Sequence, residues 1–517
     1  MVTFPAFLRE QRPNHRIACL HHNPHSFRCW PLSGNIAIFP PVLHTSPVFH
    51  LYPQSHGGDV TRYTTCLLLF TVLFLSFTNT LLPSPLFAEG FRVFDHGAAA
   101  TGQGAAFSAQ ADNPSAVHYN PAGMTQLEGI QFSTGTLLIG GSIRFKGENG
   151  SKVKGDLGGT VSNPPPSTIF LTAHLPALGL TNLPNWTVGL GLTSPFALSI
   201  EYPDNSSIAS INTMATLPLI DIKPTLGYKV NDYIAIGGGL DIYTFADFLG
   251  EGQAELHRNA RPGGADFGIP AGTGLEANGS DTALGFNASL LWTPWRNDQG
   301  QPRLNLGFVY RNGADLNLDG QFLSGGALVA DASTTIELPD VYTWAIAGWP
   351  VRNARHEWKV EVDVEYADWT DLEDINVELS NGLTIPEPRN YGDAWIVLVG
   401  TEYTLLSPSP VPHWDVSFRG GYVRSETPVR SRTFEPANPD SDFNALSVGL
   451  GFLCHSGGKF LGVLPCNGFG AKAIGVDLAY QVLLYDTRDI KNNRQPALNG
   501  KWDSTLHVGA LSLRLMF

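Results

Sequence analysis

The side chains that could do covalent or metal chemistry are few in this sequence. It has five cysteines and fifteen histidines in 517 residues. Cys454 and Cys466 are twelve positions apart near the C-terminus. In an exported protein this spacing predicts one local disulfide, with two free thiols as the alternative. Only His455 lies close to them, which is too few ligands for a structural zinc site, so we expect no metal.

The histidines give no sign of a catalytic centre. Nucleophilic catalysis needs a serine or cysteine held beside a histidine and an acid. No histidine accompanies a Gly-x-Ser-x-Gly or similar frame, and most fall in turn-like sequence. Those beyond residue 88 are His96, His118, His174, His257, His356, His413, His455 and His507. We therefore expect that the chain is not an enzyme.

Composition narrows the class of protein. Charged residues make up 15% of the chain, aromatic residues 11%, and there are 55 glycines. No apolar run reaches the ~18 residues that predict a membrane-spanning helix. The formal net charge of −14 argues against a nucleic-acid partner, because phosphate binding needs a basic face.

The longest apolar run, Cys66 to Phe77, predicts a secretion signal. It follows Arg62 and leads to a small residue, Ala88, which is the arrangement of a cleavable signal peptide. We expect residues 60–88 to be this signal, with cleavage after Ala88. An N-terminal membrane anchor is the alternative, although twelve residues are too few to span a bilayer.

Residues 1–59 precede that signal and are rich in histidine and proline, without a clear period. Because an export signal belongs at the start of a chain, we expect residues 1–59 to be a non-native extension. Translation would then begin downstream, for instance at Val60. A peptide from residues 1–59 in mature membranes would contradict this expectation.

From about Gly129 to Phe517 the sequence predicts strand after strand and no amphipathic helix. Because successive side chains of a strand point to opposite faces, an alternating sequence gives each strand one apolar face. Ile474 to Leu484 alternates in this way. The clearest strand sets Trp358, Val360, Val362, Val364 and Tyr366 against Lys359, Glu361, Asp363 and Glu365.

The C-terminus distinguishes a membrane barrel from a soluble β-sandwich, whose apolar faces point inward. Leu511, Leu513, Leu515 and Phe517 share one face of the final strand. This alternation, ending in Phe517, resembles the terminal signal of outer-membrane barrels, which implies the barrel-assembly machinery as a partner. An ordinary strand that ends in Phe by chance is the alternative.

Aromatic placement and strand number also favour an all-β, antiparallel transmembrane barrel over residues 129–517. Ten of the eleven tryptophans lie in the strand region, and several flank short turns, as in interfacial girdles. These are Trp186, Trp292, Trp295, Trp349, Trp358 and Trp414. We expect about fourteen strands, an even number as bacterial barrels require. They begin near residues 130, 166, 186, 218, 233, 282, 303, 339, 356, 393, 413, 443, 472 and 503.

Residues 89–128 precede the first strand and lack a strand pattern. They are small and polar, with Gly97, Gly102 and Gly104 and many alanines. Asp112-Asn113-Pro114-Ser115 predicts a turn or a helix cap. Such small side chains can pack compactly inside a barrel lumen, so we expect this segment to be a plug, or hatch.

The same segment carries a family resemblance. Gly90-Phe91, the Gly102-x-Gly104 pair, Asp112-Asn113 and Asn120-Pro121-Ala122-Gly123 resemble the N-terminus of the FadL/TodX family. These are outer-membrane transporters of long-chain fatty acids and aromatic hydrocarbons. Ser194-Pro195-Phe196 and Tyr366-x-x-Trp369 extend the resemblance loosely along the barrel. It implies a monomer in outer-membrane lipid of a Gram-negative bacterium, with no cofactor.

The resemblance also implies a route. Ligand is captured among the third and fourth outer loops, about residues 248–281 and 312–338, and moves to a pocket at the start of the hatch. A shift of the hatch opens a path, and substrate leaves sideways at a kinked third strand. The resemblance puts Phe91 in the pocket lining, and we expect Phe94 and the apolar loop residues Leu318, Phe322 and Leu323 as further ligand contacts. The implied hatch or gating residues are Asn120, Pro121, Ala122, Gly123 and Pro195.

Each role has a plainer alternative. Phe91 could belong to a disordered terminus, and the Asn120 motif could only stabilise the plug. Pro195 could simply end a strand, since proline cannot donate to a ladder. The candidate partners of a ligand carboxylate are Arg258, Arg261 and Arg311, although arginines in loops are more often solvated.

These features predict transport of hydrophobic compounds, with long-chain fatty acids ahead of aromatic hydrocarbons. An apolar pocket can hold a tail without an energy source, because each CH₂ removed from water gains about 0.8 kcal/mol. Three other classes stay open: a general porin for small solutes, a structural or adhesive barrel, and a barrel-embedded lipase or protease. The hatch argues against the open porin.

Overall fold

The computed structural model describes residues 89–157, 167–245, 252–264, 266–408, 411–460 and 462–517. The described residues, from 89 to 517, belong to one compact unit. The expected extension, 1–59, and the expected signal, 60–88, lie outside the described residues. In the part of the chain that the structure describes, no helix is long and apolar enough to cross a membrane.

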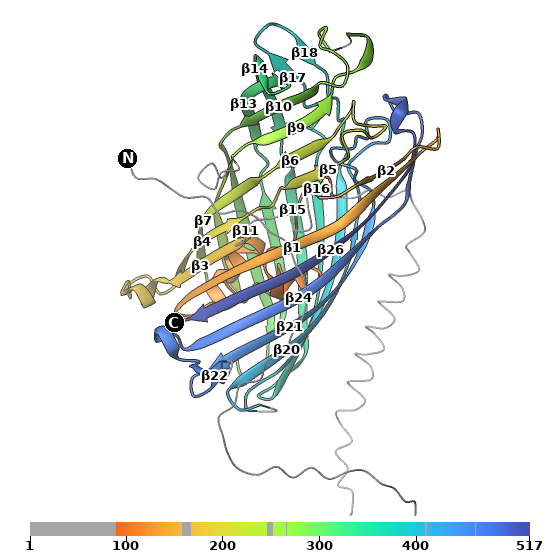
Figure 1. Cartoon of the computed structure of the whole chain (residues 1–517). Coiled ribbons are helices and arrows are strands. Elements are labelled where there is room, and N and C mark those ends of the chain that lie inside the picture. Colours follow the sequence, from red (N-terminus) through yellow and green to blue (C-terminus); the bar gives the residue numbers. More distant parts are fainter. Residues whose placement is uncertain (1–88, 158–166, 246–251, 265, 409–410, 461) are drawn as a thin grey trace, which may run out of the picture. The chain divides into compact units, whose positions relative to one another are not determined.

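Fourteen antiparallel strands close into a barrel (Figure 1). Their order around the wall follows the chain, and β1 pairs with β26 to close the ring, from Gln131 opposite Met516 to Gly147 opposite Gly500. Lipid offers no hydrogen-bond partner, so a sheet can cross it only without a free edge. The wall strands are β1 (Ile130–Gly147), β3 (Thr168–His174), β4 (Trp186–Thr193), β7 (Leu219–Lys229), β8 (Ile234–Phe245), β11 (Ala283–Arg296), β12 (Pro302–Arg311), β15 (Asp340–Arg352), β16 (His356–Asp368), β19 (Ala394–Leu405), β20 (Trp414–Ser425), β21 (Phe443–His455), β24 (Ala473–Tyr485) and β26 (Gly500–Met516).

The predicted barrel is confirmed in strand number and position. Every wall strand begins within three residues of the position expected from the sequence. In β24, Leu478 and Tyr480 are 44% and 47% exposed, whereas Asp477 and Gln481 are fully buried. The apolar face therefore points out of the barrel and the polar face into the lumen, the reverse of a soluble sheet.

The expected aromatic girdle is only partly present. Trp292 and Trp295 are exposed on the outer face, as expected. Trp349 is not in the girdle, because it is buried against Ala109 of the hatch. Trp349 has the same parity in β15 as the buried Ala347, so the two-residue period turns it toward the lumen.

A second sheet of eight strands, which the sequence did not predict, is built from four of the outer connections. We call it the loop sheet. Figure 1 shows it at the end of the barrel away from the C-terminus. Its strands, in spatial order, are β18 (Thr384–Ile385), β17 (Val377–Leu379), β14 (Ala327–Glu337), β13 (Asp315–Ser324), β10 (Gly274–Ser280), β9 (Ala254–Asn259), β6 (Met214–Leu217) and β5 (Leu198–Glu201).

Short elements complete both rims of the barrel. β2 (Lys152–Gly155) and β25 (Arg488–Ile490) extend the wall beside β1 and β26 at the outer end. At the other end a disulfide joins Cys454 to Cys466, with Cα atoms 5.7 Å apart, and closes the connection from β21 to β24. The remaining elements are β22 (Lys459–Phe460), β23 (Leu464–Pro465) and the 3-10 helices η2 (Leu175–Leu178), η4 (Pro262–Gly264), η5 (Gly468–Gly470) and η6 (Pro496–Leu498).

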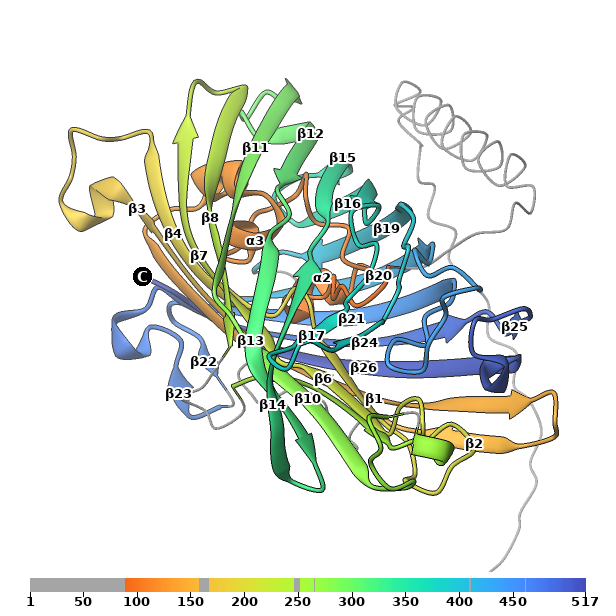
Figure 2. The ribbon, with the colours of Figure 1, turned by 90° about the horizontal axis from the view of Figure 1, so that it is seen from above.

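The hatch lies in the lumen, as expected. It contains two single-turn helices, α2 (Ala98–Thr101) and α3 (Ala116–Tyr119), and the 3-10 helix η1 (Pro121–Gln126). Figure 2, seen from above, shows α2 and α3 inside the ring of strands. Gly123 shows how tight the packing is, because a Cβ there would lie 2.4 Å from the Cβ of Ala111. Larger side chains would not fit between the hatch turns.

Candidate functional site

Two carboxylates on the lumen face of β16 hold the middle of the hatch. The Oδ2 atom of Asp363 accepts hydrogen bonds from the backbone N–H groups of Phe107 and Ser108, at 3.1 and 3.0 Å. Glu361 Oε1 accepts in the same way from the next two residues of the hatch, at 2.6 and 3.2 Å. The Lys359 Nζ atom lies 2.9 Å from Glu361 and balances its charge. Because hydrogen bonds to a charged acceptor are about twice as strong as neutral ones, this ladder fixes the hatch backbone.

The predicted motif at Asn120 ties the end of the hatch to the opposite wall. Asn120 Nδ2 donates to the carbonyl oxygen of Leu290 in β11 at 3.3 Å, and its Oδ1 accepts from the N–H of Ala122 at 3.1 Å. Pro121 lies against Gly237 of β8, where a Cβ would be 2.5 Å from the Pro121 carbonyl carbon. The motif therefore caps η1 and joins it to two wall strands.

A buried charge cluster lies on the lumen face of β7, β8 and β12. Lys223 forms ion pairs with Asp221 and Asp241. Arg311 lies 3.6 Å from Asp241 and donates to the carbonyl oxygen of His118 in α3 at 2.9 Å. Arg311, the last residue of β12, is thus neither solvated nor free to pair with a ligand carboxylate, because its guanidinium group already contacts Asp241 and the hatch.

The first residues of the hatch pair with the chain that follows β4. The N–H of Val93 donates to the carbonyl oxygen of Pro195 at 2.8 Å, and the N–H of Ala197 donates to that of Phe91 at 3.0 Å. Arg92 pairs with Glu365 of β16 at 2.5 Å. Phe91 is therefore ordered, and the chain at Pro195 turns away from the wall toward the hatch.

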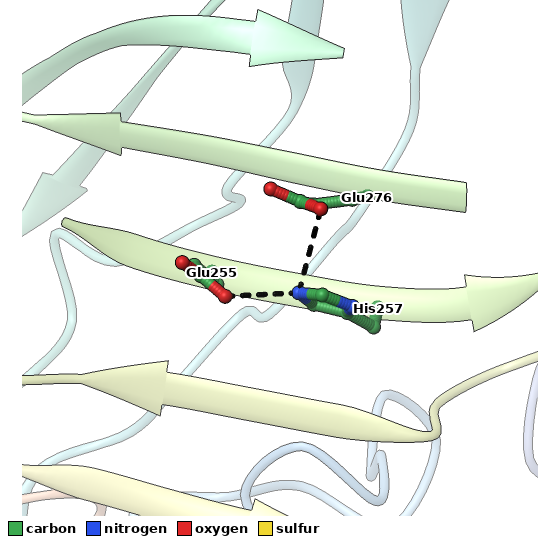
Figure 3. A group of neighbouring side chains, drawn as sticks. All are labelled: Glu255, His257 and Glu276. Carbon is green, nitrogen blue, oxygen red and sulfur yellow. Dashed lines mark hydrogen bonds and ion pairs between the residues drawn. The ribbon is translucent and has the colours of Figure 1, made fainter. Parts of the chain in front are cut away.

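On one face of the loop sheet three polar side chains come together (Figure 3). The His257 Nε2 atom of β9 lies 3.0 Å from Glu255 Oε2 and 4.0 Å from Glu276 Oε2 of β10. Among the described residues these three offer ligand atoms, all within 4.8 Å of one another, of the kinds that bind a divalent cation. They already pair with one another, and this contact pins β9 to β10.

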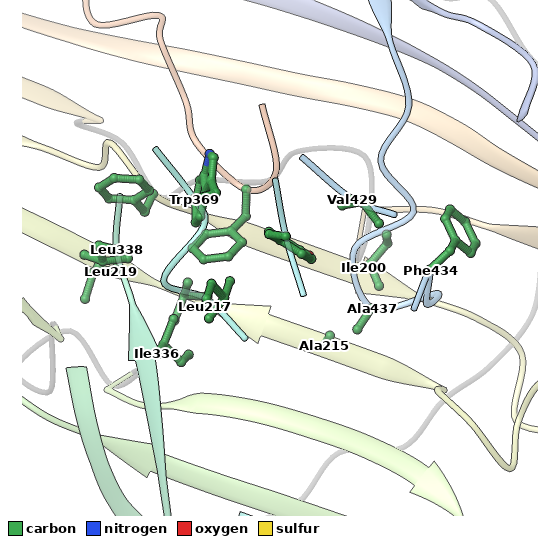
Figure 4. Close-up of a cluster of buried hydrophobic side chains, with 14 of the residues drawn as sticks. Ile200, Ala215, Leu217, Leu219, Ile336, Leu338, Trp369, Val429, Phe434 and Ala437 are labelled. Atoms are coloured by element: carbon green, nitrogen blue, oxygen red, sulfur yellow. The ribbon is translucent and has the colours of Figure 1, made fainter. Parts of the chain in front are cut away.

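An apolar cavity of about 120 Å³ lies between the loop sheet and Phe91 of the hatch. Phe91 packs edge-on against Trp369 and Phe196, with ring centroids 4.8 and 6.1 Å apart. Figure 4 shows the surrounding cluster, in which Leu217 and Ala437 converge from different connections. An engineered cavity of ~150 Å³ holds one benzene, so this one is of the size of a single small apolar group, such as one ring or a short length of alkyl chain, and not of a whole long-chain ligand. Its aliphatic walls include Leu198, Leu217, Leu256, Leu318, Ile336, Ile375 and Val377.

Among the described lining residues one side chain is basic, Arg389, in the connection from β18 to β19. Its Nη2 atom lies 2.6 Å from Glu435 Oε1, and its Nη1 atom lies 3.4 Å from Glu387 Oε2. Burial raises the pKa of Glu435 to about 7, although Arg389 opposes the shift. The cavity therefore holds a guanidinium group that loses part of its counter-charge when Glu435 is protonated.

The structure brings two of the five implied ligand contacts, Phe91 and Leu318, to the cavity. Phe94 lies elsewhere and stacks on Phe443 of the wall at 6.0 Å. Phe322 is buried in a separate cluster of the loop sheet, and Leu323 points to the other face of β13. The two arginines of the third outer connection do not line the cavity either, because Arg258 pairs with Asp266 at 2.8 Å and the backbone N–H of Arg261 donates to the same carboxylate.

Several site residues were missed from the sequence. Leu217 and Leu256 lie in strands short enough to be taken for loops. Leu256 lies between the polar Glu255 and His257, and that two-residue period could have identified it. Arg389 and Glu435 lie in connections without a period, and only the tertiary fold brings them together.

The sequence matches a known protein family and several characterised outer-membrane proteins. A family model described as outer membrane protein transport protein (OMPP1/FadL/TodX) matches residues 80–517. The long-chain fatty acid transport protein of Escherichia coli O6:H1 is 24% identical over 416 residues, which are 74% of this chain and 87% of that protein. Outer membrane protein P1 of Haemophilus influenzae is 22% identical over 462 residues, or 81% and 93% of the two chains.

Solved structures share the fold. A Pseudomonas aeruginosa FadL homologue superposes with a TM-score of 0.65 at 19% identity, covering 83% of this chain and 100% of that one. The Ralstonia pickettii toluene transporter TbuX gives a TM-score of 0.54 at 16% identity, covering 82% and 100%. At these identities the likeness shows a common fold and nothing finer.

Replacing Asp363 with alanine is expected to loosen the hatch. Two backbone N–H groups lose their acceptor, and each buried unpaired donor costs about 1–3 kcal/mol. We expect more frequent ion conductance in planar bilayers than for the native barrel. Glu357→Ala on the same strand is the matched control, because Glu357 contacts Arg352 at 3.0 Å and not the hatch. Native-like conductance of Asp363→Ala would show that this carboxylate does not hold the hatch.

Proposed function

The chain belongs to the OMPP1/FadL/TodX family of outer membrane transport proteins, and from this we propose that it takes up long-chain fatty acids. It is an outer-membrane β-barrel of a Gram-negative bacterium, from a family of transporters of hydrophobic compounds and not of enzymes. The observation that carries the proposal is the apolar cavity bounded by Phe91. A ligand that fills it touches the segment that blocks the lumen.

Ligand burial can offset part of what holds the start of the hatch. Two backbone hydrogen bonds join residues 91–93 to residues 195–197. Each contributes about 0.5–1.5 kcal/mol net, so separating them costs about 1–3 kcal/mol. Each CH₂ of an apolar tail that leaves water gains about 0.8 kcal/mol, so burial of four methylenes offsets that part of the cost. The Arg92–Glu365 ion pair and the packing of Phe91 on Trp369 add to the cost that the rest of the ligand must offset.

The position of Pro195 supports a lateral exit beside β3. Pro195, which cannot donate to a ladder, follows the end of β4 on the far side of β3. We assign Pro195 and the Asn120 motif to gating, with ligand passing into lipid beside β3.

The same route suits aromatic hydrocarbons, which are the second candidate substrate. The cavity volume of about 120 Å³ fits a single ring, and one structural relative is a toluene transporter. The two ligand classes differ in the carboxylate, and Arg389 is the cavity residue that can pair with it. The E. coli relative, a long-chain fatty acid transport protein, favours the fatty acid.

The remaining assignments concern biogenesis. We propose a monomeric barrel that the barrel-assembly machinery recognises through β26, where Leu511 and Leu513 are exposed ahead of Phe517. A signal at residues 60–88 precedes the hatch in this account. The Cys454–Cys466 bridge then lies in the periplasm, a compartment in which disulfides persist.

Phe91→Ala is expected to weaken binding of labelled oleate and of labelled toluene at least tenfold. Burial of a Phe side chain contributes about 1.5–3 kcal/mol, and 1.4 kcal/mol is a factor of ten. Phe94→Ala is the control, because it removes the same kind of ring three residues further along the chain, at a position outside the cavity.

Deletion of residues 89–94 should abolish uptake, and unchanged oleate uptake after this deletion would refute the role of the N-terminus.

Oleate affinity is expected to fall between pH 6 and pH 8, whereas toluene affinity is not. The pKa of Glu435 is raised to about 7, above the ordinary 4.5. Glu435 is therefore mostly protonated at pH 6, where Arg389 can pair with the ligand carboxylate. At pH 8 Glu435 is mostly ionised and competes with the ligand carboxylate for Arg389. Glu435→Gln should make the oleate affinity flat over this range. The same pH dependence in Glu435→Gln and the native protein would exclude this pairing.

A further inference from the structure

Five basic side chains line one groove on the outer face of the barrel. The groove has a volume of about 420 Å³ and runs over the ends of β1, β2 and β26. Between the basic positions lie Phe145, Val153 and Trp502, which are buried against the core on the inner face. Strand alternation therefore turns the basic residues outward. They are Arg144, Lys146, Lys152, Lys154 and Lys501.

The strand ends that carry the groove, at β2, lie at the end of the barrel away from the C-terminus (Figure 1). The outward positions of β1 run from Phe132 to the exposed Leu138, then through Gly140 and Ser142 to Arg144. At ~3.3 Å per residue and a tilt of ~40°, Arg144 is about 15 Å further out along the barrel axis than Leu138, in the direction of the outer-leaflet headgroups.

The lysines of the groove face one another and lack counter-charges among the described residues. Lys146 has a lysine directly opposite on each side, Lys152 in β2 and Lys501 in β26. Like charges facing each other across strands are destabilising. Arg144 pairs with Asp503 at 2.6 Å, but none of the four lysines has an ion-pair partner within 4.0 Å among the described residues.

The acidic groups near the groove do not neutralise it. Asp489 lies opposite Lys501 in the ladder but pairs with Lys491 at 2.9 Å. Glu148 lies in the turn between β1 and β2 and forms no ion pair with the four lysines. The chain as a whole carries a net charge of −14, so a basic groove of this size does not follow from its composition.

We propose that this groove binds the phosphate groups of an anionic lipid of the outer leaflet, the phosphorylated glycolipid that faces the medium. Lysine makes point contacts with phosphate, and the groove offers four lysines without an ion-pair partner among the described residues, beside an arginine that pairs with Asp503. Basic clusters beside a membrane bind anionic headgroups in this way. Beneath the groove Phe145 and Trp502 stack at 4.3 Å, so the strands that carry the basic residues are packed against the core.

The test is a native mass spectrometry titration of the purified barrel with diphosphoryl lipid A. Lys146→Gln/Lys152→Gln/Lys154→Gln is expected to bind at least tenfold more weakly than the native barrel. The control variant, Lys229→Gln/Lys459→Gln/Lys472→Gln, removes the same charge at the opposite end, and it should bind within twofold of native. Native protein should bind the same lipid without its phosphates at least tenfold more weakly.

Three results would overturn the proposal. They are native-like binding by the groove variant, equal loss in the groove and control variants, and equal binding of the lipid with and without phosphates. If the triple groove variant does not fold, as judged by heat-modifiable gel migration, Lys152→Gln/Lys154→Gln on the rim hairpin replaces it. That variant is expected to lose at least threefold, and native-like binding by it would count against the proposal in the same way.

Discussion

Lipid satisfies no backbone hydrogen bond, and this constraint determines where every polar side chain of the wall can point. With the sheet closed on itself, apolar residues face lipid within the hydrocarbon layer, and charged residues at that depth point into the lumen. Isolated charges there would be costly, so they need partners. In β16 the hatch supplies them, because its backbone N–H groups meet the carboxylates of Glu361 and Asp363.

The same constraint explains why the ligand cavity lies at the outer end. The lumen beside β16 is filled by charged side chains and hatch backbone, and the cavity there, lined by Arg92 and Glu365, has a volume of only about 10 Å³. Beyond the wall the connections are free to form a sheet of their own, and its apolar face meets Phe91. The cavity and the polar lock are therefore linked through one short segment, residues 91–107.

The barrel could be predicted from the sequence, because a two-residue period and an even strand number are strong signals. The charged face of Trp358 to Tyr366 was visible as well, but its partner lies some 250 residues earlier, and no local pattern connects them. The loop sheet escaped prediction because its strands are short and its connections long. Phe322 was assigned to the cavity because it is apolar, whereas the loop sheet uses it for its own core. Phe91 was placed through the family resemblance alone.

The most direct test of the account is hydrogen–deuterium exchange of the hatch amides at residues 107–110, with and without oleate. Without ligand these four N–H groups are predicted to exchange as slowly as the wall strands, because carboxylates hold them in the lumen. With oleate bound they should exchange faster, since the ligand displaces Phe91 and loosens the hatch. Rapid exchange without ligand, or slow exchange that oleate does not alter, would contradict a hatch locked by β16 and released from the cavity.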